Sequence, residues 1–250
     1  MKCVKFLIMK GKKNIIIQIL FVLASCEALA NIAISPTLLE LREDSLIGEI
    51  VLENQGPEAK LFEASLKKWT QKDNADIFEA TTDIIVLPLS ANILANKKQK
   101  FRIILRKPAL PEAQDNYRLF FSETRKFISV KNGLSFLLNI NLPVFSNGKN
   151  LNNTLGVNWS VKQTQNKSVG ELMLSNNGSK TFVVTSFKLS GRSEYSDNNM
   201  RYVLPGASVV LNIPLKEVKS DAIHIKYVIS GKSESVDLKI IPLKSLKNAK

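Results

Sequence analysis

The strongest alternation of apolar and polar positions in the chain lies in residues 134–145. Every even position from 134 to 144 is apolar, whereas the odd positions are mixed. Alternation with period two is typical of a β-strand and places the even side chains on one face of a sheet. We call these six positions the apolar rail, and they are Leu134, Phe136, Leu138, Ile140, Leu142 and Val144. The rail is either half of an ordinary sandwich core or a surface that is exposed so that another protein can bind it.

Short strand-like segments also make up the rest of the chain after residue 30. About seven of them precede residue 146, turn signals such as Asn54–Pro57 recur between them, and no segment has a convincing helical period. This pattern is typical of a β-sandwich. Residues 146–153 are polar and contain glycine, as a linker does, and a second set of strand-like segments follows. We therefore predict an all-β chain with one domain in residues 31–147 and another in residues 148–250.

The first thirty residues have the features of a leader rather than of a folded domain. Five lysines are followed by the apolar run Ile15–Ala24 and then by the small-residue pattern Ala28–Ala30. These features predict a signal peptide in residues 1–30 that is cleaved after its last residue, and hence an exported protein. The apolar run is shorter than the roughly 20 residues that a membrane span needs, so we expect no stable membrane insertion. An alternative is a lipoprotein box that ends at Cys26, where a lipid would be attached.

The sequence contains few candidates for a catalytic site, a metal site or a disulfide. Both cysteines, Cys3 and Cys26, lie in the leader, and the single histidine, His224, lies in an alternating, strand-like segment. The exported chain therefore offers neither a disulfide framework nor a site with several histidines. Its serines and carboxylates are scattered, without the spacing of a nucleophile elbow or a phosphate loop. We expect no catalytic residue, no metal and no cofactor, and hence no enzyme.

The charge of the chain is strongly positive. The formal net charge is +13, of which the leader contributes +4, so residues 31–250 carry +9. A nucleic-acid-binding protein gathers its basic residues in a patch or stripe, whereas here they are spread along the chain. The charge therefore indicates solubility and attraction to acidic partners, and we expect no nucleic acid among the partners.

Several segments, in their order and spacing, resemble the periplasmic chaperones of the chaperone–usher pilus pathway. In the first half of the chain these segments are residues 34–41, 53–56, 65–69, 84–88, 102–106, 117–123 and 142–145. In the second half they are residues 174–178 and 202–206. The hairpin that contains Trp69 and the Leu-Pro-Val-Phe segment that ends at Phe145 are most similar to the archaic, spore-coat-like branch of the family.

The resemblance implies two immunoglobulin-like β-sandwiches in tandem, set at an angle, in a periplasmic chaperone for fimbrial subunits. In this family a subunit lacks the last strand of its sandwich. The chaperone lends it the last strand of its own first domain, and then delivers the subunit to an outer-membrane usher. Such strand addition combines backbone hydrogen bonds with apolar side chains. The donor residues that the resemblance implies are Leu134, Phe136, Leu138 and Ile140. Burial of four such side chains stabilises a complex by about 6–12 kcal/mol before ordering costs.

The family also anchors the C-terminal carboxylate of the subunit with two basic residues, and this sequence departs from that pattern. The anchor positions fall on Leu38 in the first strand and on Asn139 or Asn141 in the donor strand, and none of them is basic. An uncharged amide binds a carboxylate more weakly than a cation does. Two alternatives therefore stay beside the chaperone: a secreted two-domain adhesion or structural module, and a chaperone paralogue without subunit anchoring. A dimer in which two copies cap each other is also left open.

Overall fold

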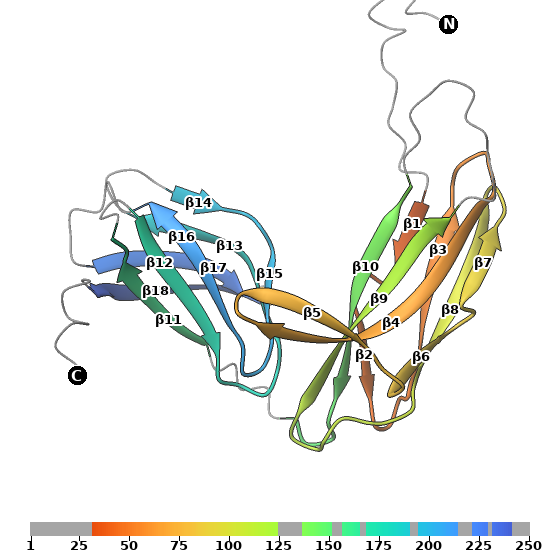
Figure 1. Cartoon of the computed structure of the whole chain (residues 1–250), viewed down its shortest axis with the longest axis horizontal. Coiled ribbons are helices and arrows are strands. Elements are labelled where there is room, and N and C mark those ends of the chain that lie inside the picture. The colour runs from red at the N-terminus through yellow and green to blue at the C-terminus, as the bar shows by residue number, and fades with distance from the viewer. Residues whose placement is uncertain are drawn as a thin grey trace, which may run out of the picture.

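The computed structural model describes residues 32–124, 137–151, 157–165, 169–190, 195–214, 222–229 and 232–241. These residues form strands β1 to β18 with their turns and connections, and none of them belongs to a helix that could cross a membrane. Two layered β-structures stand at an angle to each other, which makes the molecule V-shaped (Figure 1). The predicted all-β fold with two sandwiches in tandem is thereby confirmed. The predicted leader lies outside the described residues.

Two sheets form the first sandwich. One sheet contains, in spatial order, β1 (Ile32–Ser35), β3 (Ile47–Asn54), β8 (Lys97–Leu105) and β6 (Ile84–Leu87). The other contains β2 (Leu39–Arg42), β10 (Asn139–Asn147), β9 (Gln114–Thr124), β4 (Lys60–Lys72) and β5 (Ala75–Ala80), and β7 (Ser90–Ile93) also pairs with β4. Pro36 lies between β1 and β2, where the chain crosses from one sheet to the other. Because proline has no N–H to give to a ladder, it suits such an interruption.

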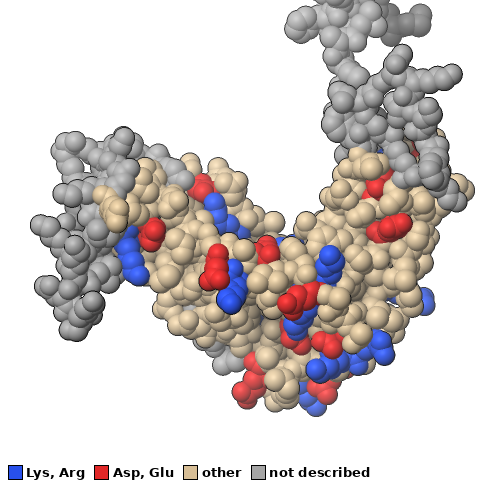
Figure 2. Space-filling view, in the orientation of Figure 1, with Lys and Arg blue, Asp and Glu red and all other residues tan. Residues whose placement is uncertain are grey.

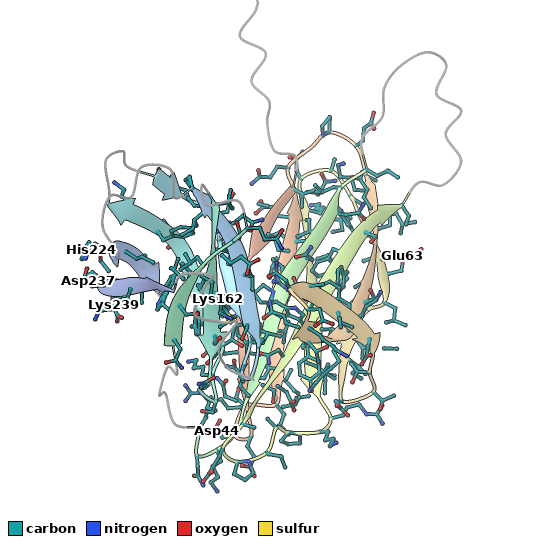
Figure 3. All side chains as sticks on the ribbon, turned by 60° about the vertical axis from the view of Figure 1, so that its left-hand side comes forward. Asp44, Glu63, Lys162, His224, Asp237 and Lys239 are labelled. Atoms are coloured by element: carbon teal, nitrogen blue, oxygen red, sulfur yellow. The ribbon has the colours of Figure 1, made fainter. Side chains whose placement is uncertain are left out.

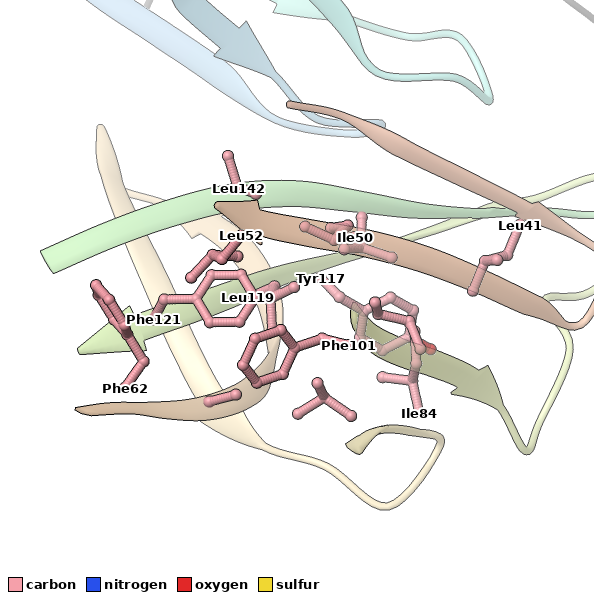
Figure 4. Packing of buried hydrophobic residues seen from close by; sticks show 14 of the residues in the cluster. Leu41, Ile50, Leu52, Phe62, Ile84, Phe101, Tyr117, Leu119, Phe121 and Leu142 are labelled. Atoms are coloured by element: carbon pink, nitrogen blue, oxygen red, sulfur yellow. The ribbon is translucent and has the colours of Figure 1, made fainter. Parts of the chain in front are cut away.

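The core of the first sandwich follows from the alternation of side chains along its strands. Phe62, Phe101 and Phe121 are fully buried, and the ring centroids of Phe101 and Phe121 lie 4.8 Å apart in an edge arrangement (Figure 4). Leu142 and Val144 of the apolar rail belong to the same core. This part of the rail is therefore ordinary sandwich core.

The second sandwich begins at β11. Its strands follow the spatial order β14 (Tyr195–Asp197), β13 (Phe182–Ser190), β17 (Ala222–Ile229), β18 (Lys232–Ile241), β11 (Val157–Gln163), β12 (Val169–Asn176) and β16 (Ser208–Pro214), and β15 (Arg201–Val203) pairs with β13. The pairing of β11 with β18 is parallel, and the other pairs are antiparallel. Leu172, Phe182 and Phe187 are among the fully buried residues of its core.

Aromatic side chains join the two sandwiches. Trp69 of β4 and Phe145 of β10 belong to the same cluster as the core of the second sandwich. The Trp69 ring lies 5.3 Å from the Tyr202 ring of β15, in an edge arrangement, and 6.4 Å from the Phe145 ring, between centroids. Phe145 faces the second sandwich because it is adjacent to Val144, which faces the first core.

The linker predicted for residues 146–153 begins later than predicted. Ser146 and Asn147 are buried residues of β10 and pair with β9. The Gln114 amide donates a hydrogen bond from Nε2 to Asn147 Oδ1 at 2.6 Å, so these polar groups are satisfied inside the protein rather than by water. The division of the chain after residue 147 stays a prediction.

The β4–β5 hairpin extends to the second sandwich and ends there in a two-residue turn (Figure 1). Asp73 and Asn74 have φ angles of 51° and 65°, the left-handed backbone that such a turn requires and that Asp and Asn tolerate. Asn74 Nδ2 donates to Val210 O at 3.0 Å, and Val210 N–H donates to Asn74 Oδ1 at 2.9 Å. The turn therefore binds the backbone of β16 through both atoms of one amide.

Gln71 makes a similar pair of bonds, from Nε2 to Tyr202 O at 3.0 Å and from Leu204 N–H to Oε1 at 2.9 Å. Each hydrogen bond stabilises the junction by about 0.5–1.5 kcal/mol. We predict that Gln71→Ala combined with Asn74→Ala lets the interdomain angle vary, so that small-angle X-ray scattering shows a broader distribution of distances. The control is Gln99→Ala, whose exposed amide bonds within the first sandwich. An unchanged distribution in the double variant would contradict this role of the hairpin.

Candidate functional site

The N-terminal half of β10 has an open edge. β9 pairs with β10 along its whole length, but β2 pairs only with its last four residues. Residues 139–143 therefore have no strand on their second side among the residues that the structure describes. Glu123 N–H donates to Leu138 O at 2.8 Å, so the alternation of an antiparallel ladder turns the backbone groups of Asn139 and Asn141 toward the open edge. An edge of this kind can pair with a strand of another protein.

The apolar rail changes its environment along this strand. Ile140 packs against the core of the first sandwich and is half-buried, whereas Leu138 is 39% exposed. Leu134 and Phe136, the two outer donor residues that the sequence predicts, lie outside the described residues. The described part of the rail thus passes from core to surface at the open edge, and the donor role of all four residues stays a prediction.

A cleft of about 850 Å³ lies between the two sandwiches. Leu38, between β1 and β2, and Asn141 of β10 both line it, so two of the three predicted anchor positions meet in the fold. Leu38 is 38% exposed. Asn139 is exposed but is not part of the lining. The cleft opens beside the free edge of β10, and a strand that pairs there could place its end in the cleft.

Arg118 of β9 supplies a positive charge to this cleft. The residue is only 8% exposed, and its guanidinium carbon lies 3.8 Å from the centroid of the Trp69 ring and 4.7 Å from that of Tyr202. Its Nη1 donates a long hydrogen bond of 3.4 Å to Asn141 Oδ1, and its Nε has no hydrogen-bond partner. Within the described part of the chain no carboxylate forms an ion pair with it. Because a guanidinium has five N–H donors, Arg118 retains donors for a ligand.

Burial lowers the pKa of Arg118 below its ordinary value, since desolvation disfavours the charged form, while Tyr202 and Asp76 act in the opposite direction. An arginine nevertheless stays protonated in a protein. A carboxylate that enters the cleft would offset the cost of burying this cation and would form charge-assisted hydrogen bonds with it. Arg201 also lines the cleft, but its Nη2 is already 2.7 Å from Asp197 Oδ2. Arg118 is therefore the better candidate for binding an anion.

Arg118 is a site residue that was not predicted from the sequence. It lies in the segment Tyr117–Phe121, whose four remaining residues are all apolar or aromatic. A segment of this composition is typical of a buried strand. The alternation does contain a signal, because Tyr117, Leu119 and Phe121 face the core and Arg118 must therefore face away from it. Its proximity to Trp69 and Asn141 depends on strand pairings between distant parts of the chain.

No group of metal-binding residues occurs in the part of the chain that the structure describes. His224 Nδ1 lies 2.6 Å from Asp237 Oδ1, and the two residues face each other across β17 and β18, at the outer end of the second sandwich (Figure 3). This contact is a cross-strand pair away from the cleft. On the face shown in Figure 2, lysine and arginine are interspersed with acidic residues and do not form one basic patch.

Comparison with known proteins finds similarity in structure alone. No family model matches the sequence, and no curated protein matches it. Among solved structures, a chain of the CsuC–CsuE chaperone–tip adhesion subunit pre-assembly complex, from the archaic chaperone–usher Csu pili of Acinetobacter baumannii, aligns with a TM-score of 0.67 and 23% identity. This match covers 85% of the present chain and 100% of that chain.

Two further structures show the same likeness at lower identity. A chain of the Salmonella enterica SafA pilin–SafB chaperone complex has a TM-score of 0.59 and 16% identity, and covers 83% of this chain and 95% of its own. The Pseudomonas aeruginosa CupB2 chaperone has a TM-score of 0.55 and 11% identity, and the match covers 82% of this chain and 98% of that chain. At these identities the comparison shows the fold. The resemblance to pilus chaperones that the sequence motifs carry is thereby confirmed at the level of structure.

Proposed function

We propose that this chain, which has the fold of the chaperones of chaperone–usher pili, is itself a periplasmic chaperone that binds fimbrial subunits by lending them a strand. The observation that carries the proposal is the open edge of β10 beside the exposed start of the apolar rail. Backbone groups at this edge would pair with an edge strand of the subunit. Leu134, Phe136, Leu138 and Ile140 would fill the groove that the missing strand leaves in the subunit.

The four donor residues would contribute unequally. Leu138 is 39% exposed and is free to change its surroundings on binding. Ile140 already packs against the chaperone's own core, so less of its apolar surface remains to be buried by a partner. Since apolar burial contributes about 25 cal/mol per Å² removed from water, we expect Leu138 to matter more than Ile140.

Arg118 would take the place of the basic anchor that Leu38, Asn139 and Asn141 do not provide. Its guanidinium lies in the cleft beside Asn141, within the lining that also contains Leu38. The C-terminal carboxylate of a subunit would bind to the free N–H groups of Arg118, and the Asn141 amide would assist. A charge-assisted hydrogen bond of this kind is roughly twice as strong as a neutral one.

The cellular setting of the proposal follows from the leader. A signal peptide in residues 1–30 would deliver the chain to the periplasm. Strand lending needs no nucleotide, because the subunit's own folding and apolar burial drive it. The chaperone would then deliver the bound subunit to an outer-membrane usher.

Coexpression with candidate fimbrial subunits from the same genome tests this function. The tagged chain, exported to the periplasm, should recover a subunit in stoichiometric amount, and Leu138→Ser should lower the affinity by up to about tenfold because roughly 1 kcal/mol of apolar burial is lost. Leu110→Ser is the matched control, since Leu110 is 75% exposed and lies beside Gly148, just past the opposite end of β10. Failure of the wild-type chain to retain any subunit would contradict the proposal.

A further inference from the structure

An ion pair closes the end of the first sandwich where β10 begins. Lys60 of β4 and Glu123 of β9 lie two residues beyond Phe62 and Phe121, on the core-facing side of their strands. Lys60 Nζ lies 2.7 Å from Glu123 Oε1, and the two side chains are 21% and 8% exposed. The aromatic core therefore ends at a polar cap.

The same carboxylate holds the backbone of the donor strand. Leu138 N–H donates to Glu123 Oε2 at 3.1 Å, while Glu123 N–H donates to Leu138 O at 2.8 Å. In a regular antiparallel pair of this type both bonds join backbone groups. Here a side-chain carboxylate accepts the bond that the backbone carbonyl would otherwise accept. This rung of the β9–β10 ladder therefore depends on one side chain, which Lys60 in turn orients.

We propose that Glu123, oriented by Lys60, is a positioning residue that fixes the start of the donor strand, at Leu138, against β9. On the inner side of this point, Ile140 packs against the core, and at the point itself Leu138 is exposed. A buried ion pair offers no apolar surface for the core to extend further. The value of this positioning for subunit binding rests on the proposed function, but the positioning itself is a property of the free chain.

A simpler role for the pair is general stabilisation of the sandwich. The two roles differ in what they require at position 123. Stabilisation by an ion pair requires opposite charges at positions 60 and 123 in either order. Positioning requires a side-chain acceptor at position 123 for the Leu138 N–H, and a lysine side chain offers none.

Amide hydrogen exchange of the free mature chain, resolved by NMR, separates the two roles. Glu123→Ala should make the Leu138 amide exchange at least about tenfold faster relative to the Leu142 amide, because a hydrogen bond to a charged acceptor is lost. Glu123→Gln, which keeps an acceptor oxygen, should have a smaller effect. The double variant Lys60→Glu with Glu123→Lys keeps the opposite charges without that acceptor and should exchange as fast as Glu123→Ala.

Two results would overturn the inference. One is slow exchange of the Leu138 amide in the charge-swapped variant, which would reduce the pair to a stabilising contact. The other is an unchanged ratio of Leu138 to Leu142 exchange in Glu123→Ala. Glu49→Gln is the control, because Glu49 forms an exposed pair with Lys100 and Arg102 in the opposite sheet. Since none of these measurements needs a subunit, their outcome does not depend on whether the proposed function holds.

Discussion

Replacement of Arg118 by methionine is expected to weaken subunit binding by about 10- to 100-fold while leaving the chain as stable as before. The expected loss corresponds to a hydrogen-bonded charge contact of about 1.5–3 kcal/mol between the guanidinium and the carboxylate of the subunit. The stability should not fall, because Arg118 is a buried cation with which no carboxylate in the described part of the free chain forms an ion pair. An apolar side chain of similar size is often neutral or stabilising at such a site.

Loss of subunit affinity without loss of stability distinguishes a binding residue from a structural one. Subunit affinity would be measured by surface plasmon resonance and stability by urea unfolding of the free chain. Arg118→Lys should give an intermediate affinity, since lysine keeps the charge but loses the planar fork and its stacking on Trp69. Arg102→Met is the control, because Arg102 is exposed in the opposite sheet and pairs with Glu49. Equal losses of stability and affinity in Arg118→Met would contradict the anchor role.

Asn139→Pro is expected to impair subunit binding and to spare the fold. The N–H of Asn139 points to the open edge of β10, so its removal breaks no bond within the β9–β10 ladder. A subunit strand that pairs there would lose one backbone hydrogen bond and keep an unsatisfied carbonyl, at a cost of about 1–3 kcal/mol. By the same alternation the backbone nitrogen of Pro143 also points away from β9, so β10 already contains a proline at an equivalent backbone position.

Two matched variants make this prediction specific to the backbone. Asn139→Ala removes the same side chain and keeps the N–H, so its subunit affinity should stay close to that of the wild type. Ile140→Pro removes an N–H that faces β9, and it should instead lower the free energy of unfolding of the free chain. If Asn139→Pro binds a subunit as well as Asn139→Ala does, strand addition at this edge is contradicted.

The all-β fold could be predicted from the sequence because the period-two alternation is local. Each strand buries one face, and residues such as Phe62 and Phe121 lie inward in a regular register with their neighbours. The alternation does not say which neighbours cover that face. Leu142 is buried because the opposite sheet covers it, whereas Leu138, which continues the same alternation just before β10 begins, lies at the open end and is exposed. The rail therefore could not be divided into core and surface from its sequence.

The candidate site was predictable only in part, for a related reason. The resemblance directed attention to Leu38 and Asn141, which do meet in one cleft. Arg118 was missed because a charged residue between apolar neighbours has meaning only once the pairing of β9 with β4 and β10 is known. Composition also misplaced the start of the linker, since it cannot show that Asn147 finds a buried partner in Gln114.

The most direct test of strand lending is hydrogen exchange of the backbone amides of Asn139 and Asn141, measured in the free chain and in its complex with a subunit. Both N–H groups face the open edge of β10 and have no partner strand among the described residues of the free chain. We predict rapid exchange in the free chain and exchange slowed by at least about a hundredfold in the complex, because new backbone hydrogen bonds would protect both amides in a tight complex. Equally rapid exchange of both amides in a stable complex would show that the subunit binds elsewhere and would contradict strand lending from β10.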